Sequence, residues 1–172
     1  MGVLADIAET YIRPARVIRR KAARGVSERQ LLAWLMAASL IALLARLPGV
    51  TARADETQPR EALAAAAIIA GLLFAPLFFY ALAAISRLGA WLLGGRGSGQ
   101  GARLALFWAL LALQPLVIAA IYLPALLPAG LPAYLVTIPA GLWFLWVWLA
   151  GLGALEIDAA RRGRQGFTDN RS

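Results

Sequence analysis

The residues best suited to chemistry lie in a glycine-rich loop, GGRGSGQG at residues 94–101, which leads directly into an apolar segment. Loops of this kind bind phosphate through backbone N–H groups at the start of the following helix. The gap between Gly94 and Gly99 matches a P-loop, but Gln100 and Gly101 stand where that motif needs lysine followed by serine or threonine. No strand precedes the loop, so we exclude a nucleotide site.

Two interpretations of this loop remain. In the first, its alternating glycines form a flexible connector between two helices. In the second, the backbone N–H groups that begin the next helix hold a lipid phosphate, with Arg87, Arg96 and Arg103 close by.

The side chains of metal and nucleophilic chemistry are missing from the chain. It contains no cysteine and no histidine, which excludes disulfides, thiolate nucleophiles, imidazole acid–base catalysis and metal ligation by those groups. No reaction can be assigned to the remaining residues. The sequence therefore predicts a protein that is not an enzyme and that needs no cofactor.

Composition indicates the solvent in which this chain folds. Hydrophobic residues make up 61% of its 172 residues, and mean hydropathy is +0.70, well above the roughly 45–50% apolar share of soluble domains. The net charge is +8, almost all from arginine, since Lys21 is the single lysine. Because the arginines flank apolar segments, we expect anionic lipids as the counter-charge and no nucleic acid.

Four apolar runs have about the length needed to cross a bilayer as helices, which is ~20 residues. They cover residues 31–47, 62–85, 103–123 and 133–155. The sequence thus predicts an all-α fold, a polytopic membrane helix bundle with one transmembrane domain over residues 31–155. The alternative of five spans would divide residues 103–155 into three pieces, each too short to cross ~30 Å of hydrocarbon.

Residues 1–30 form a basic amphipathic segment. A helix before Pro14 would place its apolar side chains on one face, with Asp6 and Glu9 off that face. The following piece has the pattern of an interfacial helix that contacts anionic headgroups. Its candidate lipid contacts are Arg16, Arg19 and Arg20. The alternative is a solvated basic tail that only enforces topology.

The charges of the loops predict the orientation of the spans. The amino-terminal segment, the 86–103 loop and the 156–172 tail are rich in arginine, whereas the 48–61 loop is balanced and the 124–132 loop is uncharged. Short cytoplasmic loops collect arginine and lysine. This alternation fits four spans with both termini in the cytoplasm.

Gln114 lies near the middle of the third span, where an unpaired amide is costly. We expect it to bond another helix or a carbonyl that Pro115 frees. A substrate path would need further polar residues at that depth, and we find Thr137, Ser39 and Tyr80. The absence of charge near the span centres argues against an ion-coupled transporter, whereas a proline in each of the last three spans keeps a broken-helix transporter open.

Small residues and tryptophans indicate further helix contacts. Gly71 belongs to a four-residue repeat of small residues, the pattern of a packing groove. Trp143, Trp146 and Trp148 lie near the middle of the last apolar run and spread around it. Either they pack against other helices or a partner chain, or that helix begins later than predicted. The expected helix or partner contacts are Gly71, Gln114, Pro115, Trp143, Trp146 and Trp148.

The middle of the chain resembles a known family. PLFFYALAAIS at residues 76–86, the basic Gly-Gly loop, and RLALFWALLALQP at residues 103–115 are similar to the Yip1 domain family in its short bacterial form. This resemblance, over roughly residues 13–155, implies a multi-pass, non-enzymatic membrane protein. Eukaryotic relatives are linked to vesicle trafficking and small GTPases through an acidic, aromatic amino-terminal region. Here that region is basic, and the usual Asp-Leu-x-Gly-Pro entry to the first span is missing, so a GTPase partner is not expected.

A structural or interaction role is therefore expected, either in membrane organisation or as an accessory subunit of a larger membrane assembly. Its partners would be the bilayer, anionic lipids, and other membrane subunits or further copies of the chain. A small-solute or lipid transporter is the alternative. The bias toward alanine, leucine and arginine is typical of GC-rich bacterial coding sequences and indicates the bacterial inner membrane.

Overall fold

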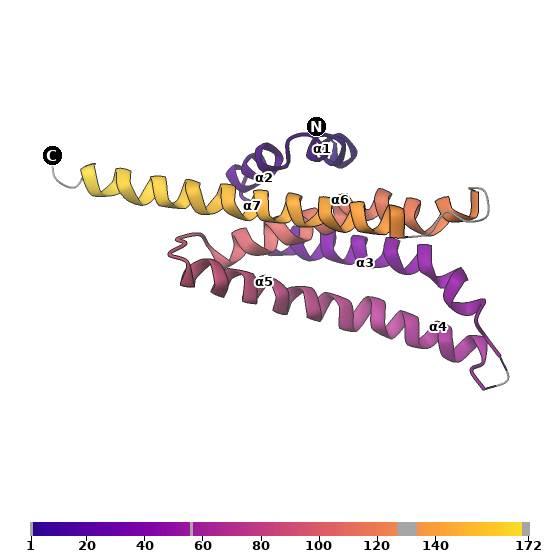
Figure 1. The fold of residues 1–172 in the computed structure, drawn as a ribbon. Helices are drawn as coiled ribbons and strands as arrows, with labels where there is room; N and C mark the ends of the chain where they lie inside the picture. Colours follow the sequence, from indigo (N-terminus) through magenta and orange to yellow (C-terminus); the bar gives the residue numbers. More distant parts are fainter. Residues whose placement is uncertain (1, 56, 127–133, 170–172) are drawn as a thin grey trace.

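The computed structural model describes residues 2–55, 57–126 and 134–169, which are mostly helical (Figure 1). The α-helices are α1 (Val3–Thr10), α2 (Pro14–Ala23), α3 (Glu28–Thr51), α4 (Arg60–Ile69), α5 (Ala75–Leu92), α6 (Gly99–Leu126) and α7 (Tyr134–Asp169), and the π-helix η1 (Ala70–Phe74) joins α4 to α5. No strand occurs in these described ranges. The predicted all-α fold is confirmed.

Four helices are long and apolar enough to cross a membrane, as the sequence predicts. They are Glu28–Thr51, Arg60–Leu92, Gly99–Leu123 and Tyr134–Arg161. Their limits differ from the predicted spans, because a helix continues past the hydrocarbon wherever its residues tolerate helical geometry. Pro48, which was placed in a loop, lies inside α3. Since α6 and α7 are each one continuous helix, the four-span fold is favoured over the five-span alternative.

The long helices run back and forth in chain order (Figure 1). At one end the start of α6 meets the start of α3, where Gln100 Nε2 donates a hydrogen bond to the Val26 carbonyl at 2.6 Å. Nearer the other end, Tyr122 OH donates to the Ala45 carbonyl at 3.1 Å. α7 extends past the bundle at the first of these ends (Figure 1).

A π-helix lies just before the proline that was expected to bend the second span. Pro76 has no N–H, and its ring crowds the carbonyl four residues earlier, at Leu72. Residues Ala70–Phe74 adopt the wider π turn, in which an N–H reaches five residues back. The helix can therefore pass Pro76 without ending.

Local signals define the corner between α2 and α3. Gly25 follows α2 with φ +70°, a left-handed conformation that glycine adopts without strain. Ser27 then caps α3, because its Oγ accepts the Gln30 N–H at 3.3 Å while Gln30 Oε1 accepts the Ser27 N–H at 3.0 Å. The corner turns the chain from the amino-terminal segment into the first span.

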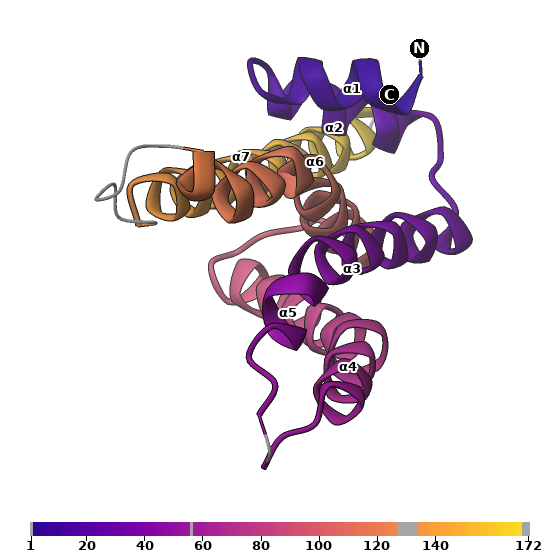
Figure 2. The same cartoon turned by 90° about the vertical axis from the view of Figure 1, so that its right-hand side faces the viewer.

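α6 is the centre of the bundle. It packs against α3, α5 and α7, and also against α1 and α2, which we call the amino-terminal hairpin. Trp108 and Phe107 are fully buried, and buried alanines at 105 and 109 let neighbouring helices approach closely. Figure 2 shows the hairpin on one side of the bundle, with α4 and α5 on the other.

Parts of two predicted segments lie outside the described residues. Most of the 124–132 loop falls within residues 127–133, and the 156–172 tail ends with residues 170–172. The described part of the tail is helical as far as Asp169.

Candidate functional site

A buried polar junction holds the amino-terminal hairpin together; it consists of Asp6, Glu9, Arg20 and Lys21. Asp6 and Lys21 are 2% and 6% exposed, and Lys21 Nζ lies 2.7 Å from Asp6 Oδ2. Arg20 donates to Asp6 Oδ1 and to Glu9 Oε2, each at 2.7 Å. Burial raises the pKa of Asp6, but the hydrogen bonds and charges of Lys21 and Arg20 outweigh it and leave that pKa below its ordinary value. The carboxylate is therefore ionised at neutral pH.

Indole rings attach this junction to the bundle. Lys21 Nζ lies 3.6 Å from the ring centroid of Trp108 on α6 and 4.9 Å from that of Trp34 on α3, distances at which a cation is attracted to the ring face. Trp108 Nε1 donates to Thr10 Oγ1 at 2.9 Å. One lysine thus connects α2 to both α3 and α6.

Tyr11 forms a second attachment, at the end of α1. Its hydroxyl donates to the Ala112 carbonyl of α6 at 3.1 Å. Its ring stacks on Trp143 of α7 with 4.4 Å between the centroids. The hairpin is therefore bonded along the side of two membrane helices and does not only touch their ends.

The polar junction was missed by reasoning from the sequence. The available signal was Lys21, the single lysine among many arginines. The Lys21 ammonium group lies between two indole rings and a carboxylate. Its partners Trp34 and Trp108 lie far along the chain, so their proximity was not visible in the sequence.

The six arginines expected to contact anionic lipids fall into two groups. Four pair with carboxylates: Arg19 with Asp158 at 3.1 Å, Arg20 with Asp6 and Glu9 at 2.7 Å, Arg87 with Glu156 at 3.6 Å, and Arg103 with Glu28. Arg16 and Arg96 are exposed and form no ion pair within the described part of the chain. A lipid phosphate would have to displace a paired carboxylate at the first four arginines and would displace no ion pair at the last two.

The glycine-rich turn at residues 93–98 is built around Glu156 of α7. The Gly97 N–H donates to Glu156 Oε2 at 2.5 Å. A Cβ at Gly95 would lie 2.6 Å from the Ala90 carbonyl oxygen, and Gly94 has φ +84°, so both positions require glycine. A carboxylate of the same chain thus occupies one of the backbone donors that could hold a phosphate.

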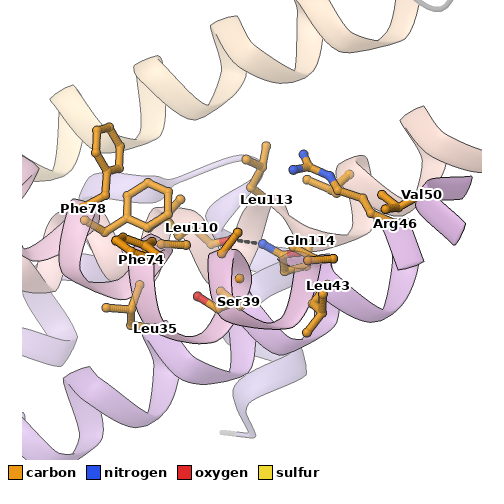
Figure 3. A pocket seen from close by; sticks show the side chains of 18 residues that line it. Leu35, Ser39, Leu43, Arg46, Val50, Phe74, Phe78, Leu110, Leu113 and Gln114 are labelled. Atoms are coloured by element: carbon orange, nitrogen blue, oxygen red, sulfur yellow. Dashed lines mark hydrogen bonds between the residues drawn. The ribbon is translucent and has the colours of Figure 1, made fainter. Parts of the chain in front are cut away.

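An apolar groove of about 540 Å³ opens between α3, η1 with α5, and α6 (Figure 3). Leucine, alanine and phenylalanine side chains form most of its walls, including Leu35, Phe74 and Phe78. Gly71 lines the groove beside α3, where an added Cβ would lie 3.4 Å from Leu43 Cβ. η1 therefore lies close to α3 at this position, with room for a methyl group in ordinary van der Waals contact.

Gln114 is one of three polar residues that line this groove, with Ser39 and Arg46, and it is 6% exposed. Its Nε2 donates to the Leu110 carbonyl at 2.8 Å. This acceptor is one turn back in the same helix, which differs from the expected partner on another helix or on the carbonyl that Pro115 frees. Gln114 Oε1 has no hydrogen-bond partner among the described residues. Pro115 is exposed, and Arg46 lies at one end of the groove (Figure 3).

The three tryptophans of the last span have three different environments. Trp143 stacks on Tyr11 of the hairpin. Trp148 packs against the core, with 5.8 Å between its ring centroid and that of Phe144. Trp146 is 47% exposed. Of the three, Trp146 is the one open to lipid or to a partner.

A family model described as the Yip1 domain matches residues 8–164. No curated protein and no solved structure matches the chain. Together with the four apolar helices, the family match indicates a membrane protein. In residues 2–55, 57–126 and 134–169, no group of three or more histidine, cysteine, aspartate or glutamate side chains could hold a metal ion.

Proposed function

Because the chain belongs to the Yip1 domain family, we propose that it is a non-enzymatic, multi-pass protein of the bacterial inner membrane with a structural or interaction role. It organises the membrane or serves as an accessory subunit of a larger membrane assembly. Its contacts are with the bilayer, with anionic lipids and with other membrane helices.

The low burial of the second span is the observation that carries this proposal. In the apolar stretch of this span, which comprises α4, η1 and α5, only 6% of the residues are buried by the rest of the chain. In the apolar stretch of α6 the share is 56%. Large apolar side chains form an outer face along this span; they are Ile68, Ile69, Leu73, Phe74, Leu77, Phe78, Ile85, Leu88, Trp91 and Leu92. A span with so few internal contacts has most of its surface free to pack against a helix of another subunit.

Site-specific crosslinking tests the interaction role. A photoreactive residue replaces Phe78 on this outer face, which is 61% exposed, and the control replaces Leu44 on α3, which is 58% exposed. After illumination in membranes and purification in mild detergent, we expect a protein adduct from position 78 and none from position 44. A chain that runs as a lone monomer, with lipid adducts alone at both positions, would contradict the subunit role.

The charges at the two ends of the bundle support cytoplasmic termini. Arg87, Arg96 and Arg103 lie at or beside the glycine-rich turn, whereas Arg53 and Arg60 at the opposite end share their loop with acidic residues. Short cytoplasmic loops are the ones that collect arginine. A reporter enzyme fused after Ser172 should respond from the cytoplasmic side, and a periplasmic response would contradict this orientation.

Arg16 and Arg96 support a contact with anionic lipid, because neither forms an ion pair with a carboxylate of the described residues. Near an anionic surface each basic residue is worth about 1 kcal/mol. We expect the double variant Arg16→Gln/Arg96→Gln to retain less phosphatidylglycerol after purification, as measured by mass spectrometry of extracted lipid. Arg53→Gln/Arg60→Gln, at the opposite end, is the matched control with the same loss of charge. Equal lipid retention in the two variants would contradict the contact.

One observation favours lipid transport as a second candidate function. The apolar groove contains a buried acceptor, Gln114 Oε1, without a partner among the described residues. Such a group can bond a donor on a lipid that passes through the groove. Reconstituted vesicles should then move fluorescent phospholipid between leaflets, more slowly with Gln114→Leu. Absence of flux, or flux unchanged by this substitution, would remove the support for transport.

A further inference from the structure

In the amino-terminal hairpin, α2 has the ordinary polarity of a surface helix, with Val17 and Ile18 buried and its arginines mostly exposed, whereas α1 has the opposite polarity. The polar junction faces inward, with Asp6 and Lys21 buried. The outward side of α1 carries an apolar stripe at intervals of four residues, formed by Leu4 (82% exposed), Ala8 and Ile12 (76% exposed). In water this arrangement is unfavourable twice over, because it exposes apolar surface and buries charge. In hydrocarbon the same arrangement is the favourable one.

The hairpin also reaches far along the long helices. Tyr11 bonds α6 at Ala112, and the axial distance from the start of that helix at Gly99 is roughly 20 Å at 1.5 Å per residue. The same ring stacks on Trp143, an equal number of residues before Glu156, which binds the glycine-rich turn. Measured along either helix, Tyr11 lies well inside a hydrocarbon core of ~30 Å.

α2 has the length required to reach this depth. It contains 10 residues, which span about 15 Å or half the hydrocarbon thickness. It ends beside Gly25 and the cap of α3, at the end of the bundle that holds the glycine-rich turn. From the far end of α2, α1 turns across the long helices (Figure 2).

Two polar side chains at the deep end, those of Thr10 and Tyr11, have partners within the protein, whereas Arg13 is exposed and forms no ion pair among the described residues. Thr10 accepts from Trp108, and Tyr11 donates to the Ala112 carbonyl. Unsatisfied hydrogen-bonding groups would forbid such a position in lipid. The pairing of Thr10 and Tyr11 lowers the free-energy cost of placing their polar groups in lipid.

We propose that residues 3–25 form a re-entrant hairpin immersed in one leaflet, with Leu4, Ala8 and Ile12 among the lipid acyl chains. This leaflet is the one at the start of α3, which is cytoplasmic in the proposed topology. The inference depends on the membrane placement of the bundle and is independent of the accessory-subunit role.

Charge favours a phospholipid leaflet over a partner helix as the occupant of this surface. Arg13, Arg16 and Arg24 lie on the hairpin, are exposed, and form no ion pair within the described residues. Long arginine side chains extend from an apolar surface to the headgroup phosphates. An apolar stripe beside free cations complements acyl chains below anionic headgroups.

Spin labels can test this immersion directly, because the chain has no cysteine of its own. A nitroxide is attached to Leu4→Cys or to Ile12→Cys in the full chain, reconstituted into vesicles of phosphatidylethanolamine and phosphatidylglycerol. Collision rates are measured with oxygen, which concentrates among acyl chains, and with a water-soluble nickel complex. Phe78→Cys on the outer face of α5 is the lipid reference, and Arg96→Cys in the glycine-rich turn is the aqueous reference.

We expect the labels at positions 4 and 12 to match the label at position 78, with frequent oxygen collisions and rare nickel collisions. Nickel collisions as frequent as those at position 96 would place the hairpin in water and overturn the proposal. Rare collisions with both reagents would show that protein covers the stripe, which would also overturn it. Both labelled side chains are exposed, so the fold should be retained, and unchanged melting temperatures of the two variants in detergent check this. Leu44→Cys on α3, at a side chain that is 58% exposed, serves as a second lipid reference, so a protein adduct at Phe78 does not affect the outcome.

Discussion

α6 and the second span, α4 through α5, are both strongly apolar helices, yet they have opposite surroundings. In α6, 56% of the apolar stretch is buried, and Trp108 and Phe107 are fully buried. In the second span 6% is buried, and Phe74 and Phe78 are each 61% exposed. Large aromatic side chains thus face protein in one helix and the outside of the bundle in the other.

This difference shows that apolar composition does not place a helix inside a membrane bundle. Lipid tails are as apolar as leucine, so burial against protein gains packing and hydrogen bonds but little hydrophobic free energy. α6 makes polar contacts with α1 and its cap, through Trp108 to Thr10 and Ala112 to Tyr11, and with α3, through Tyr122 to Ala45. Among the described residues, the second span has one comparable link, from Arg87 to Glu156. Polar contacts therefore distinguish the central helix from the peripheral one.

Removing an aromatic ring from each helix should give the largest difference in the free energy of unfolding. Trp108→Ala should destabilise the protein by about 3–5 kcal/mol, because it leaves a cavity and removes the indole partner of Thr10 and Lys21. Phe78→Ala, on the outer face, should cost no more than about 0.5 kcal/mol. Denaturant titration of the purified protein in one detergent measures both. Equal losses would show that the exposed face is covered by protein or that Trp108 is poorly packed.

Enlarging a side chain in each helix should give a smaller difference in the free energy of unfolding between the two helices. Ala109 is fully buried in α6, and Ala66 is exposed in α4. Ala109→Leu should cost about 1–3 kcal/mol through overpacking, whereas Ala66→Leu should be close to neutral. The same titration reads both variants. A neutral Ala109→Leu would contradict close packing around α6.

Two glycines of α7 extend the comparison to the hairpin. A Cβ at Gly151 would overlap the Ile18 side chain of α2, whereas a Cβ at Gly153 would meet nothing within 4 Å. Gly153→Ala should stabilise the helix by about 0.5–1 kcal/mol, because alanine has the better helix propensity. Gly151→Ala carries the same gain but must displace Ile18, so we expect a net loss of about 1 kcal/mol. If both substitutions stabilised the protein, the hairpin would be shown to pack loosely on α7.

Acid should have the smallest effect, and on the hairpin it should act through Asp6 and Glu9. The pKa of Asp6 is lowered below its ordinary value of 3.8 in the folded protein, so its contribution to stability is complete above that value and is lost as pH falls below it. Glu9, whose pKa Arg20 also lowers, adds to the same trend. The distance between spin labels placed in α1 and α6, measured by electron paramagnetic resonance, should lengthen below pH 3.8. Asp6→Asn should flatten this dependence, and a profile unchanged by that substitution would contradict the assignment.

Much of the fold could be predicted from the sequence, because it follows from local properties. A helix spans the membrane when about 20 successive residues are apolar, and the four runs satisfied this condition without reference to one another. Their ends were predicted less well. Pro48 lies inside α3, because one missing N–H near the end of a long helix does not stop it.

The candidate site could be predicted only in part. The basic turn was visible as a run of glycines and arginines, but the carboxylate that binds it, Glu156, comes from another helix. Gln114 was recognised as a buried amide, yet its donor bonds its own helix at Leu110. The polar junction was not predicted, because it needs Asp6, Lys21 and Trp108 together.

The sequence alone determined that this protein is a four-span helical membrane protein with one strongly basic side, since hydropathy and charge add along the chain. The tertiary structure decided which helix lies at the centre, which arginines are paired, and that Asp6 and Lys21 of the hairpin are buried. Those features depend on side chains that meet across distant segments. In lipid, where apolar surface alone selects no partner, packing shape and hydrogen bonds make that choice.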